Sequence, residues 1–126
     1  EFYALMICAM AASYDCAPTQ DSKFGIRLPI DMHSGEIKPE VWQNWLSFDP
    51  LNLVETYTDC LKSLDVCFID CGNKDQYNLH FGSRLLHQKL TSLGIEHTYD
   101  EFSGTHSGIE DRLDISMPML ANSLQN

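Results

Sequence analysis

The chain has few basic residues: 8 Lys and Arg stand against 18 Asp and Glu among 126 residues, for a formal charge of −10. These bases are scattered along the sequence and form no basic patch. A phosphate backbone or an anionic membrane surface would repel such a chain. The charge balance therefore predicts no nucleic-acid partner and no membrane partner.

Long apolar runs are also missing, because none reaches the roughly 20 residues that a membrane-spanning helix needs. The apolar run over residues 2–12 has no basic leader, so it makes a poor signal peptide. The five cysteines are odd in number and form no C-x-x-C pair, which favours reduced thiols over a disulfide framework or a zinc site. We therefore expect a cytoplasmic protein with no metal and no cofactor.

Apolar residues make up 44% of the chain, which is enough for a core, and its length suits one domain or a piece of one. The first residue is Glu1, and the apolar run follows at once. This start is typical of a chain that begins in mid-domain. We therefore expect a single partial domain over residues 1–126.

Three segments predict strands. Residues 2–12 form an unbroken apolar run, which suits a buried strand of a parallel sheet, although their Ala and Met content also permits a helix. Residues 66–71 form the clearest strand and stop at Gly72. Residues 95–102 alternate between apolar and polar positions.

The remaining segments predict a long loop and four helices. Residues 13–35 contain Pro18, Gly25, Pro29 and Gly35 and favour an irregular loop. Helical spacing, with Asp49 as a cap of the second helix, predicts helices over residues 39–46, 51–63, 78–93 and 109–124. Strands that alternate with helices pair in parallel with right-handed crossovers. We expect an α/β fold with a partial doubly wound parallel sheet of about three strands and flanking helices. Residues 1–13 would be a strand, 14–63 a loop and helical excursion, and 64–126 the remaining strands and helices.

Two residues with catalytic chemistry follow consecutive predicted strands. Asp75 comes after the strand that ends at Gly72, and His106 comes after the strand over residues 95–102. Functional groups in open parallel sheets collect beyond the carboxyl ends of the strands. A histidine oriented by a carboxylate is the base of a Ser-His-Asp system, so we predict an acid–histidine pair between Asp75 and His106.

A nucleophile for this pair is missing from the sequence. No G-x-S-x-G elbow occurs, and the segment GTHSG over residues 104–108 places His106 at its centre with Ser107 displaced by one position. Ser107 is therefore a weak candidate for the nucleophile and a better one for local loop bonding. Cys71, at the end of a strand, lacks the setting of a reactive thiol. Asp70 is a rival acid inside the strand.

The segment DCGNKDQYNLHFGSRLLHQKLTSLGIEHTYDEFSGTHSG, residues 70–108, resembles the C-terminal part of an esterase family of α/β-hydrolases that includes esterase D-like and enterochelin-esterase-like enzymes. The shared features are a G-x-x-D turn after an apolar strand, a helix closing near LGI, an H-x-Y-x-x-F strand and a G-x-H loop. Residues 2–15 resemble the strand after the nucleophile helix, and residues 42–55 resemble the excursion before the acid strand.

The resemblance implies that the chain is the C-terminal half of a serine esterase. Asp75 would be the acid and His106 the base, while the serine and the oxyanion-hole loop would precede residue 1. The substrate would be a small-molecule ester that the sequence does not identify. Alone, the chain would be inactive or weak.

Two other functions remain open at this point. The chain could be a non-catalytic binding or assembly module with a remnant hydrolase fold. Residues 2–12 would then present an unpaired sheet edge to another chain, in a homo-oligomer or with a companion N-terminal fragment. A metal site at Asp75, His106 and either Asp100 or Glu101 is the third possibility.

Overall fold

The computed structural model describes residues 1–17 and 24–125. They fall into two compact units, Glu1–Leu53 and Val54–Asn126, each with its own buried cluster. The middle of the loop predicted over residues 13–35, including Pro18, lies outside the described residues. The single partial domain over residues 1–126 stays a prediction.

The first unit opens with a helix where a strand was predicted. Helix α1 spans Phe2–Tyr14, so the strand over residues 2–12 is wrong. Ala and Met are strong helix formers that recur in this run, and Ile7 is its only β-branched residue. A helix also satisfies its own backbone, whereas a strand needs a neighbour for its N–H and C=O groups. Residues 2–12 consequently offer no sheet edge to a partner.

Helix α2, Pro39–Leu46, has the predicted bounds and packs in the first unit. The buried core of this unit comes from α1 and α2: Ala11, Val41 and Trp45. Beside it, the buried carboxylate of Asp15 accepts hydrogen bonds from Arg27 Nε at 2.5 Å and from Asn44 Nδ2 at 3.1 Å. This carboxylate ties the end of α1 to both the following loop and α2.

The single helix predicted over residues 51–63 is wrong, because the chain forms two short helices there. Helix α3 spans Pro50–Leu53 and helix α4 spans Thr58–Lys62, with a turn over residues 54–57 between them. Asp49 caps α3 as predicted, since its Oδ1 accepts the N–H of Leu51 at 2.9 Å. The interruption falls on Val54, Thr56 and Tyr57, whose β-branched and aromatic side chains are weaker helix formers.

The second unit is built on a βαβ motif, as the sequence predicted. Strand β1 (Phe68–Gly72), helix α5 (Leu79–Ser92) and strand β2 (Thr98–Phe102) follow one another, and the strands pair in parallel. Among the residues that the structure describes, the sheet has these two strands instead of about three, because residues 2–12 are helical. An α/β class fits this mixture of helix and parallel strand.

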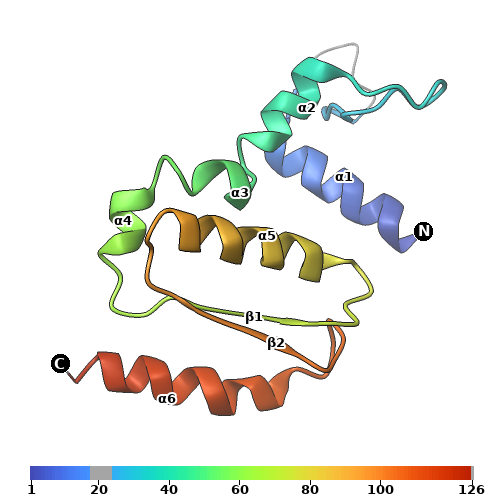
Figure 1. Ribbon diagram of the computed structural model, residues 1–126. Helices are drawn as coiled ribbons and strands as arrows, with labels where there is room; N and C mark the ends of the chain where they lie inside the picture. The colour runs from blue at the N-terminus through green and yellow to red at the C-terminus, as the bar shows by residue number, and fades with distance from the viewer. Residues whose placement is uncertain (18–23, 126) are drawn as a thin grey trace. The chain divides into compact units, whose positions relative to one another are not determined.

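Helices lie along both sides of the two strands (Figure 1). On one side, α5 contributes the buried Leu90, which packs with Val54, Ile95 and the partly buried Ile69. On the other side lies α6, Leu113–Ser123, preceded by a single 3₁₀ turn, η1, over Glu110–Arg112. The helix predicted over residues 109–124 is therefore confirmed for its main part, and Pro118 lies inside α6 without ending it.

Arg112 fastens η1 to the sheet. Its Nε lies 2.9 Å from Asp70 Oδ2, its terminal nitrogen binds Asp100, and its guanidinium lies 4.4 Å from the centre of the Phe102 ring. Asp70 and Asp100 are partners in the strand register, so two like charges would face each other without this cation. The side chains of Ile69 and Asp70 point to opposite faces because strand side chains alternate.

Glu101 makes a second charged link, between β2 and α5. Arg84 donates Nε to Glu101 Oε2 at 2.7 Å and a terminal nitrogen to Oε1 at 2.6 Å, and the Tyr99 hydroxyl donates to Oε2 at 2.9 Å. The hydrogen bonds from Arg84 and then Tyr99 lower the pKa of Glu101 to about 2. Glu101 is therefore an ionised carboxylate at neutral pH.

No helix within the described ranges is long and apolar enough to pass through a bilayer.

Candidate active site

Backbone hydrogen bonds hold the turn after β1 against the loop after β2. The N–H of Asn73 donates to the carbonyl of Phe102, and the N–H of Lys74 donates to the carbonyl of Gly104, each at 2.9 Å. Both segments lie beyond the carboxyl ends of the parallel strands, where the sequence predicted the site. The turn that carries Asp75 is therefore placed directly beside the loop that carries His106.

Gly72 makes this close approach possible. A Cβ atom at Gly72 would lie 2.5 Å from the carbonyl oxygen of Gly104 and 2.7 Å from that of Thr105. Both are backbone atoms, which cannot rotate out of the way as a flexible side chain can. Only glycine fits at this position without moving the loop that carries His106.

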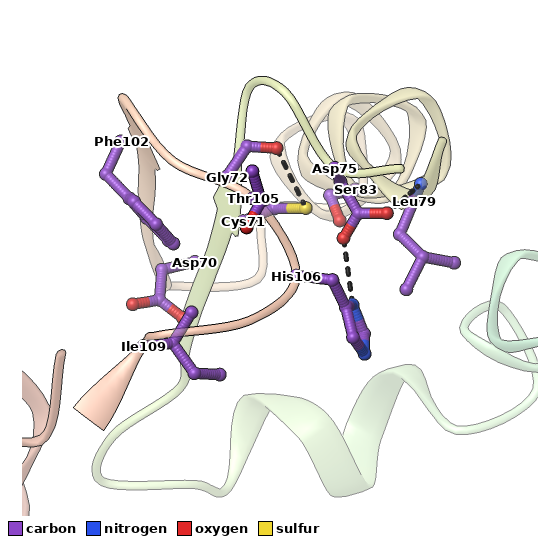
Figure 2. A pocket seen from close by; sticks show the side chains of 10 residues that line it. All are labelled: Asp70, Cys71, Gly72, Asp75, Leu79, Ser83, Phe102, Thr105, His106 and Ile109. Atoms are coloured by element: carbon purple, nitrogen blue, oxygen red, sulfur yellow. Dashed lines mark hydrogen bonds and ion pairs between the residues drawn. The ribbon is translucent and has the colours of Figure 1, made fainter. Parts of the chain in front are cut away.

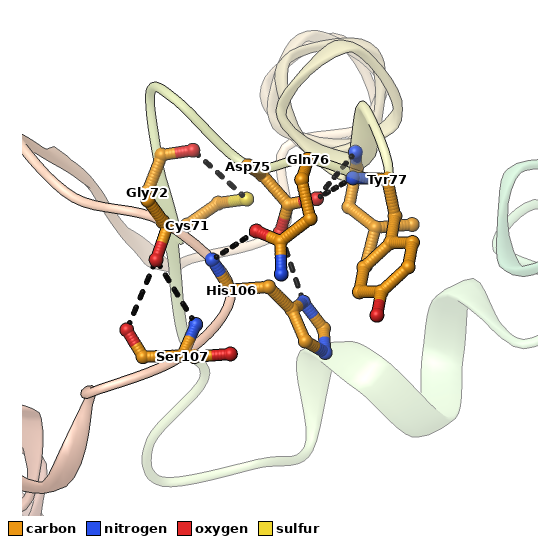
Figure 3. A network of polar contacts seen from close by, with 9 residues as sticks. Cys71, Gly72, Asp75, Gln76, Tyr77, His106 and Ser107 are labelled. Atoms are coloured by element: carbon orange, nitrogen blue, oxygen red, sulfur yellow. Dashed lines mark hydrogen bonds and ion pairs between the residues drawn. The ribbon is translucent and has the colours of Figure 1, made fainter. Parts of the chain in front are cut away.

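The carboxylate of Asp75 is enclosed, with its side chain 2% exposed. Its Oδ1 accepts the N–H of Tyr77 at 2.7 Å and the N–H of Leu79, at the start of α5, at 3.4 Å. Its Oδ2 lies 2.9 Å from Nδ1 of His106. The N–H groups at the entry to α5 thus hold one carboxylate oxygen and leave the other for the imidazole, as Figure 3 shows.

The imidazole of His106 is fixed on one side and open on the other. Besides the contact with Asp75, the backbone N–H of His106 donates to Gln76 Oε1 at 3.1 Å. The Tyr77 ring meets the imidazole edge-on, with ring centres 5.0 Å apart at an angle of 89°. The His106 side chain is nevertheless 48% exposed. Gln76 and Tyr77, which directly follow Asp75 in the sequence, thus both contact His106.

The electrostatics of the pair favour an ionised acid and a base in one tautomer. Burial alone would raise the pKa of Asp75, but the hydrogen bonds from His106, Tyr77 and Leu79 outweigh it, and the pKa lies below its ordinary value. An ionised carboxylate can only accept, so Nδ1 of His106 carries the proton. In the neutral ring, Nε2 then holds the lone pair that a general base needs.

A pocket of about 160 Å³ opens at this pair. Figure 2 shows the imidazole with its Nε2 edge turned away from Asp75. The pocket has a mixed polar and apolar lining from β1, α5 and the loop after β2: Asp70, Cys71, Gly72, Asp75, Leu79, Ser83, Phe102, Thr105, His106 and Ile109. A small molecule with a polar reacting group and an apolar body would match this lining.

The rival acid, Asp70, is not the partner of His106. Its carboxylate pairs with Arg112 at 2.9 Å, while His106 pairs with Asp75. Asp70 lines the pocket, but its carboxylate is already paired with the guanidinium of Arg112. The predicted juxtaposition of Asp75 and His106 is thus present, and their catalytic role stays a prediction.

Ser107 is bonded into its own loop, and the thiol of Cys71 is not activated. Ser107 is bonded locally through its backbone, with its N–H 3.2 Å from Thr105 Oγ1 and its carbonyl accepting from the same hydroxyl at 3.1 Å. Burial raises the pKa of the Cys71 thiol; a hydrogen bond from Ser83 lowers it, and the nearby carboxylates raise it further, so the net shift is upward. Cys71 therefore stays protonated, and the protonated thiol is the unreactive form.

The residues of the metal site that the sequence left open as a third possibility are not gathered together. Asp100 binds Arg112 and Glu101 binds Arg84, while Asp75 and His106 bind each other. In the described part of the chain, no group of three or more His, Cys, Asp and Glu side chains is arranged to hold a metal ion.

Sequence reasoning missed the residues that support the pair. Gln76 and Tyr77 give no catalytic signal of their own, although their position directly after Asp75 places them at the turn. Gly72 was predicted as the end of its strand but not as a point of close backbone contact, which an isolated glycine at a strand end indicates.

No protein-family model matches the chain, and no curated protein matches its sequence. The resemblance of residues 70–108 to the esterase family therefore stays a prediction. The functional argument consequently depends on the geometry of Asp75, His106 and their pocket.

Proposed function

We propose that this chain contributes the acid and the base of a carboxylic-ester hydrolase of the serine type. Asp75 is the acid and His106 is the base. The serine comes from a companion segment of the same enzyme, N-terminal to this part. The substrate is a small-molecule ester, and the reaction needs no cofactor.

One observation supports this proposal most directly: an enclosed carboxylate lies 2.9 Å from Nδ1 of an imidazole that is half exposed. Two backbone amides and the imidazole all donate to this carboxylate. A carboxylate used only for stability has no need of a solvent-facing histidine. The arrangement matches what acyl transfer asks of an acid and a base.

The proposed roles follow from the two nitrogens of His106. Nε2 takes the proton of the serine hydroxyl as the oxygen attacks the ester carbonyl, and it then returns the proton to the leaving alcohol. Asp75 stays ionised and stabilises the imidazolium that forms between these steps. In the second half-reaction, Nε2 takes a proton from water as the water oxygen attacks the acyl-serine carbonyl, and it returns this proton to the serine oxygen as the carboxylic acid product leaves. The companion segment supplies the donors for the oxyanion.

Hydrolysis of p-nitrophenyl acetate by this chain tests the proposal. Without an aligned serine, we expect only slow turnover, measured as p-nitrophenol release after any initial burst from exposed thiols. His106→Ala should remove most of this turnover, because His106 is the base that Asp75 orients. His33→Ala, which changes an exposed histidine of the first unit, is the matched control and should react like the wild type. Equal turnover in the His106 variant and the wild type would remove His106 from the mechanism.

A second candidate function is assembly through the edge of the small sheet. Among the described residues, β1 and β2 have only each other as strand partners, so each strand has one free edge. Free edges favour pairing with another chain. In this second proposal, a non-catalytic module with a remnant hydrolase fold pairs with a second copy of itself.

Light scattering at increasing protein concentration tests the assembly. We expect the mass to rise from 14.3 kDa towards twice that value. Added salt should strengthen the association, because it screens the repulsion between two chains of charge −10. A mass of one chain at every concentration and salt level would contradict this candidate.

A further inference from the structure

A pair of histidines lies at the opposite end of the sheet from the candidate active site. His87 is on α5 and His97 directly precedes β2, and His87 Nδ1 lies 2.8 Å from His97 Nε2. His106, in contrast, follows the end of β2. Since a strand rises about 3.3 Å per residue, the length of β2 separates the two histidine sites.

The ring of His97 is oriented by a backbone carbonyl. Its Nδ1 lies 2.7 Å from the carbonyl oxygen of Ile95, which is buried. A carbonyl only accepts, so Nδ1 of His97 carries the proton and, in the neutral ring, Nε2 holds the lone pair. A histidine that gives one N–H to a carbonyl and presents the other nitrogen is arranged as metal-ligating histidines are.

The ring of His87 is oriented by stacking. It lies nearly parallel to the Tyr99 ring, with centres 4.7 Å apart at an angle of 16°. Tyr99 is itself held by its hydrogen bond to Glu101. Both imidazoles are partly buried, and their two ring nitrogens, which come from different elements, face each other.

We propose that His87 and His97 together bind one divalent transition-metal ion of the zinc, nickel or copper class. Imidazole nitrogens suit these ions, whereas magnesium and calcium prefer oxygen. His87 would shift its proton from Nδ1 to Nε2, and the ion would replace that proton between the rings. The pair keeps the same number of protons before and after binding, so no co-reactant is needed.

The distances allow this exchange with a small movement. Metal–nitrogen bonds of about 2.0–2.1 Å around a tetrahedral ion place two nitrogens roughly 3.3 Å apart. The two nitrogens need to separate by only about 0.5 Å from their present 2.8 Å, and each ring must also turn so that its lone pair points at the ion instead of at the other ring. Water completes the coordination, because within the described ranges no third ligating side chain joins the pair.

The surroundings favour entry of a cation. A pocket of about 240 Å³ adjoins His97 and is also lined by Asp65, Cys67 and Glu96. The pocket brings solvent to the His97 side of the pair. The chain as a whole carries a charge of −10, which raises the local concentration of cations.

Zn²⁺ titration of the full chain, followed by long-range ¹H–¹⁵N correlation of the histidine rings, tests the site. We expect Nδ1 of His87 and Nε2 of His97 to shift together and to saturate at about one equivalent. Zinc held by a cysteine thiol alone, including Cys67 in the pocket beside His97, does not produce a joint shift of both ring nitrogens. His87→Gln or His97→Gln should weaken binding at the remaining ring by at least about tenfold.

Two variants act as controls. His33→Gln removes an exposed histidine and should leave the titration unchanged. His106→Gln removes the base of the candidate active site and should also leave it unchanged, so failure of this site and failure of the proposed esterase role are separable. Ring signals of His87 and His97 that do not move in excess Zn²⁺ would overturn the proposal. The same follows if either ring shifts equally well when the other is replaced.

Discussion

Replacing Gly72 with alanine is expected to lower the free energy of unfolding of residues 54–126 by at least about 1–3 kcal/mol. The new Cβ would lie 2.5 Å from the carbonyl oxygen of Gly104, and this contact is relieved only if the loop that carries His106 moves away. We therefore also expect Nδ1 of His106 to lose its hydrogen bond with Asp75. Urea denaturation measures the first effect, and the ¹⁵N shift of the His106 ring measures the second.

Gly82→Ala is the matched control for this substitution. Gly82 lies inside α5, and a Cβ there would meet no atom within 4 Å. Alanine is a better helix former than glycine, so this variant should gain about 0.5–1 kcal/mol of stability. If Gly72→Ala proves as stable as Gly82→Ala, the two segments do not approach as closely as these contacts require.

Replacing Asp75 with alanine is expected to cost about 1.5–3 kcal/mol of stability at neutral pH. The substitution removes the acceptor of the N–H groups of Tyr77 and Leu79 and of the imidazole of His106. These donors then lie beside an apolar methyl group, where water reaches them poorly. Denaturation by urea at pH 7 measures the loss. The p-nitrophenyl acetate turnover should fall in the same variant, because nothing then holds the tautomer of His106.

The cost of this substitution should depend on pH with a definite sign. The folded pKa of Asp75 lies below its ordinary value of 3.8. The stability that ionised Asp75 gives to the folded state is therefore fully present above that value. This stability is lost as the pH falls through the lowered pKa of the folded state. We expect the difference in stability between the wild type and Asp75→Ala to narrow below about pH 4.

Asp31→Ala provides the control for an exposed carboxylate with similar backbone bonds. Asp31 accepts the N–H groups of His33 and Ser34 at 2.9 Å each, but its side chain is 45% exposed. Solvent replaces lost partners there, so its removal at pH 7 should change stability by no more than about 0.5 kcal/mol. A cost at Asp75 no larger than the cost at Asp31 would show that the enclosed carboxylate has no special role in the fold.

The segments that the sequence predicted well are those whose local pattern agrees with their surroundings. The apolar spacing of residues 78–93 corresponds to α5, and the glycine at position 72 ends β1 where the apolar run stops. Because α5 lies between two strands, parallel pairing follows from chain connectivity. The position of Asp75 and His106 at the same edge of the sheet follows from that topology and from their order in the chain.

The segments that the sequence predicted poorly are those where a local pattern permits two structures. An apolar run such as residues 2–12 suits a buried strand or a buried helix, because periodicity is lost when every position is apolar. Helix α1 and the turn between α3 and α4 were decided by backbone pairing and by packing, which act beyond the local pattern. The ion pairs of Arg112 were likewise decided by the tertiary structure, since its two carboxylate partners, Asp70 and Asp100, lie 42 and 12 residues away along the chain.

Sequence alone determined the acidic character of the chain, the βαβ order of residues 66–102 and the positions of Asp75 and His106 after two consecutive strands. These depend on composition, short-range spacing and connectivity, which the chain carries in its local order. Tertiary structure alone decided that His106 bonds to Asp75 and not Asp70, that Gly72 must lack a side chain, and that His87 meets His97. Each of these depends on a distance between segments that are remote in sequence, and only the folded packing sets such a distance.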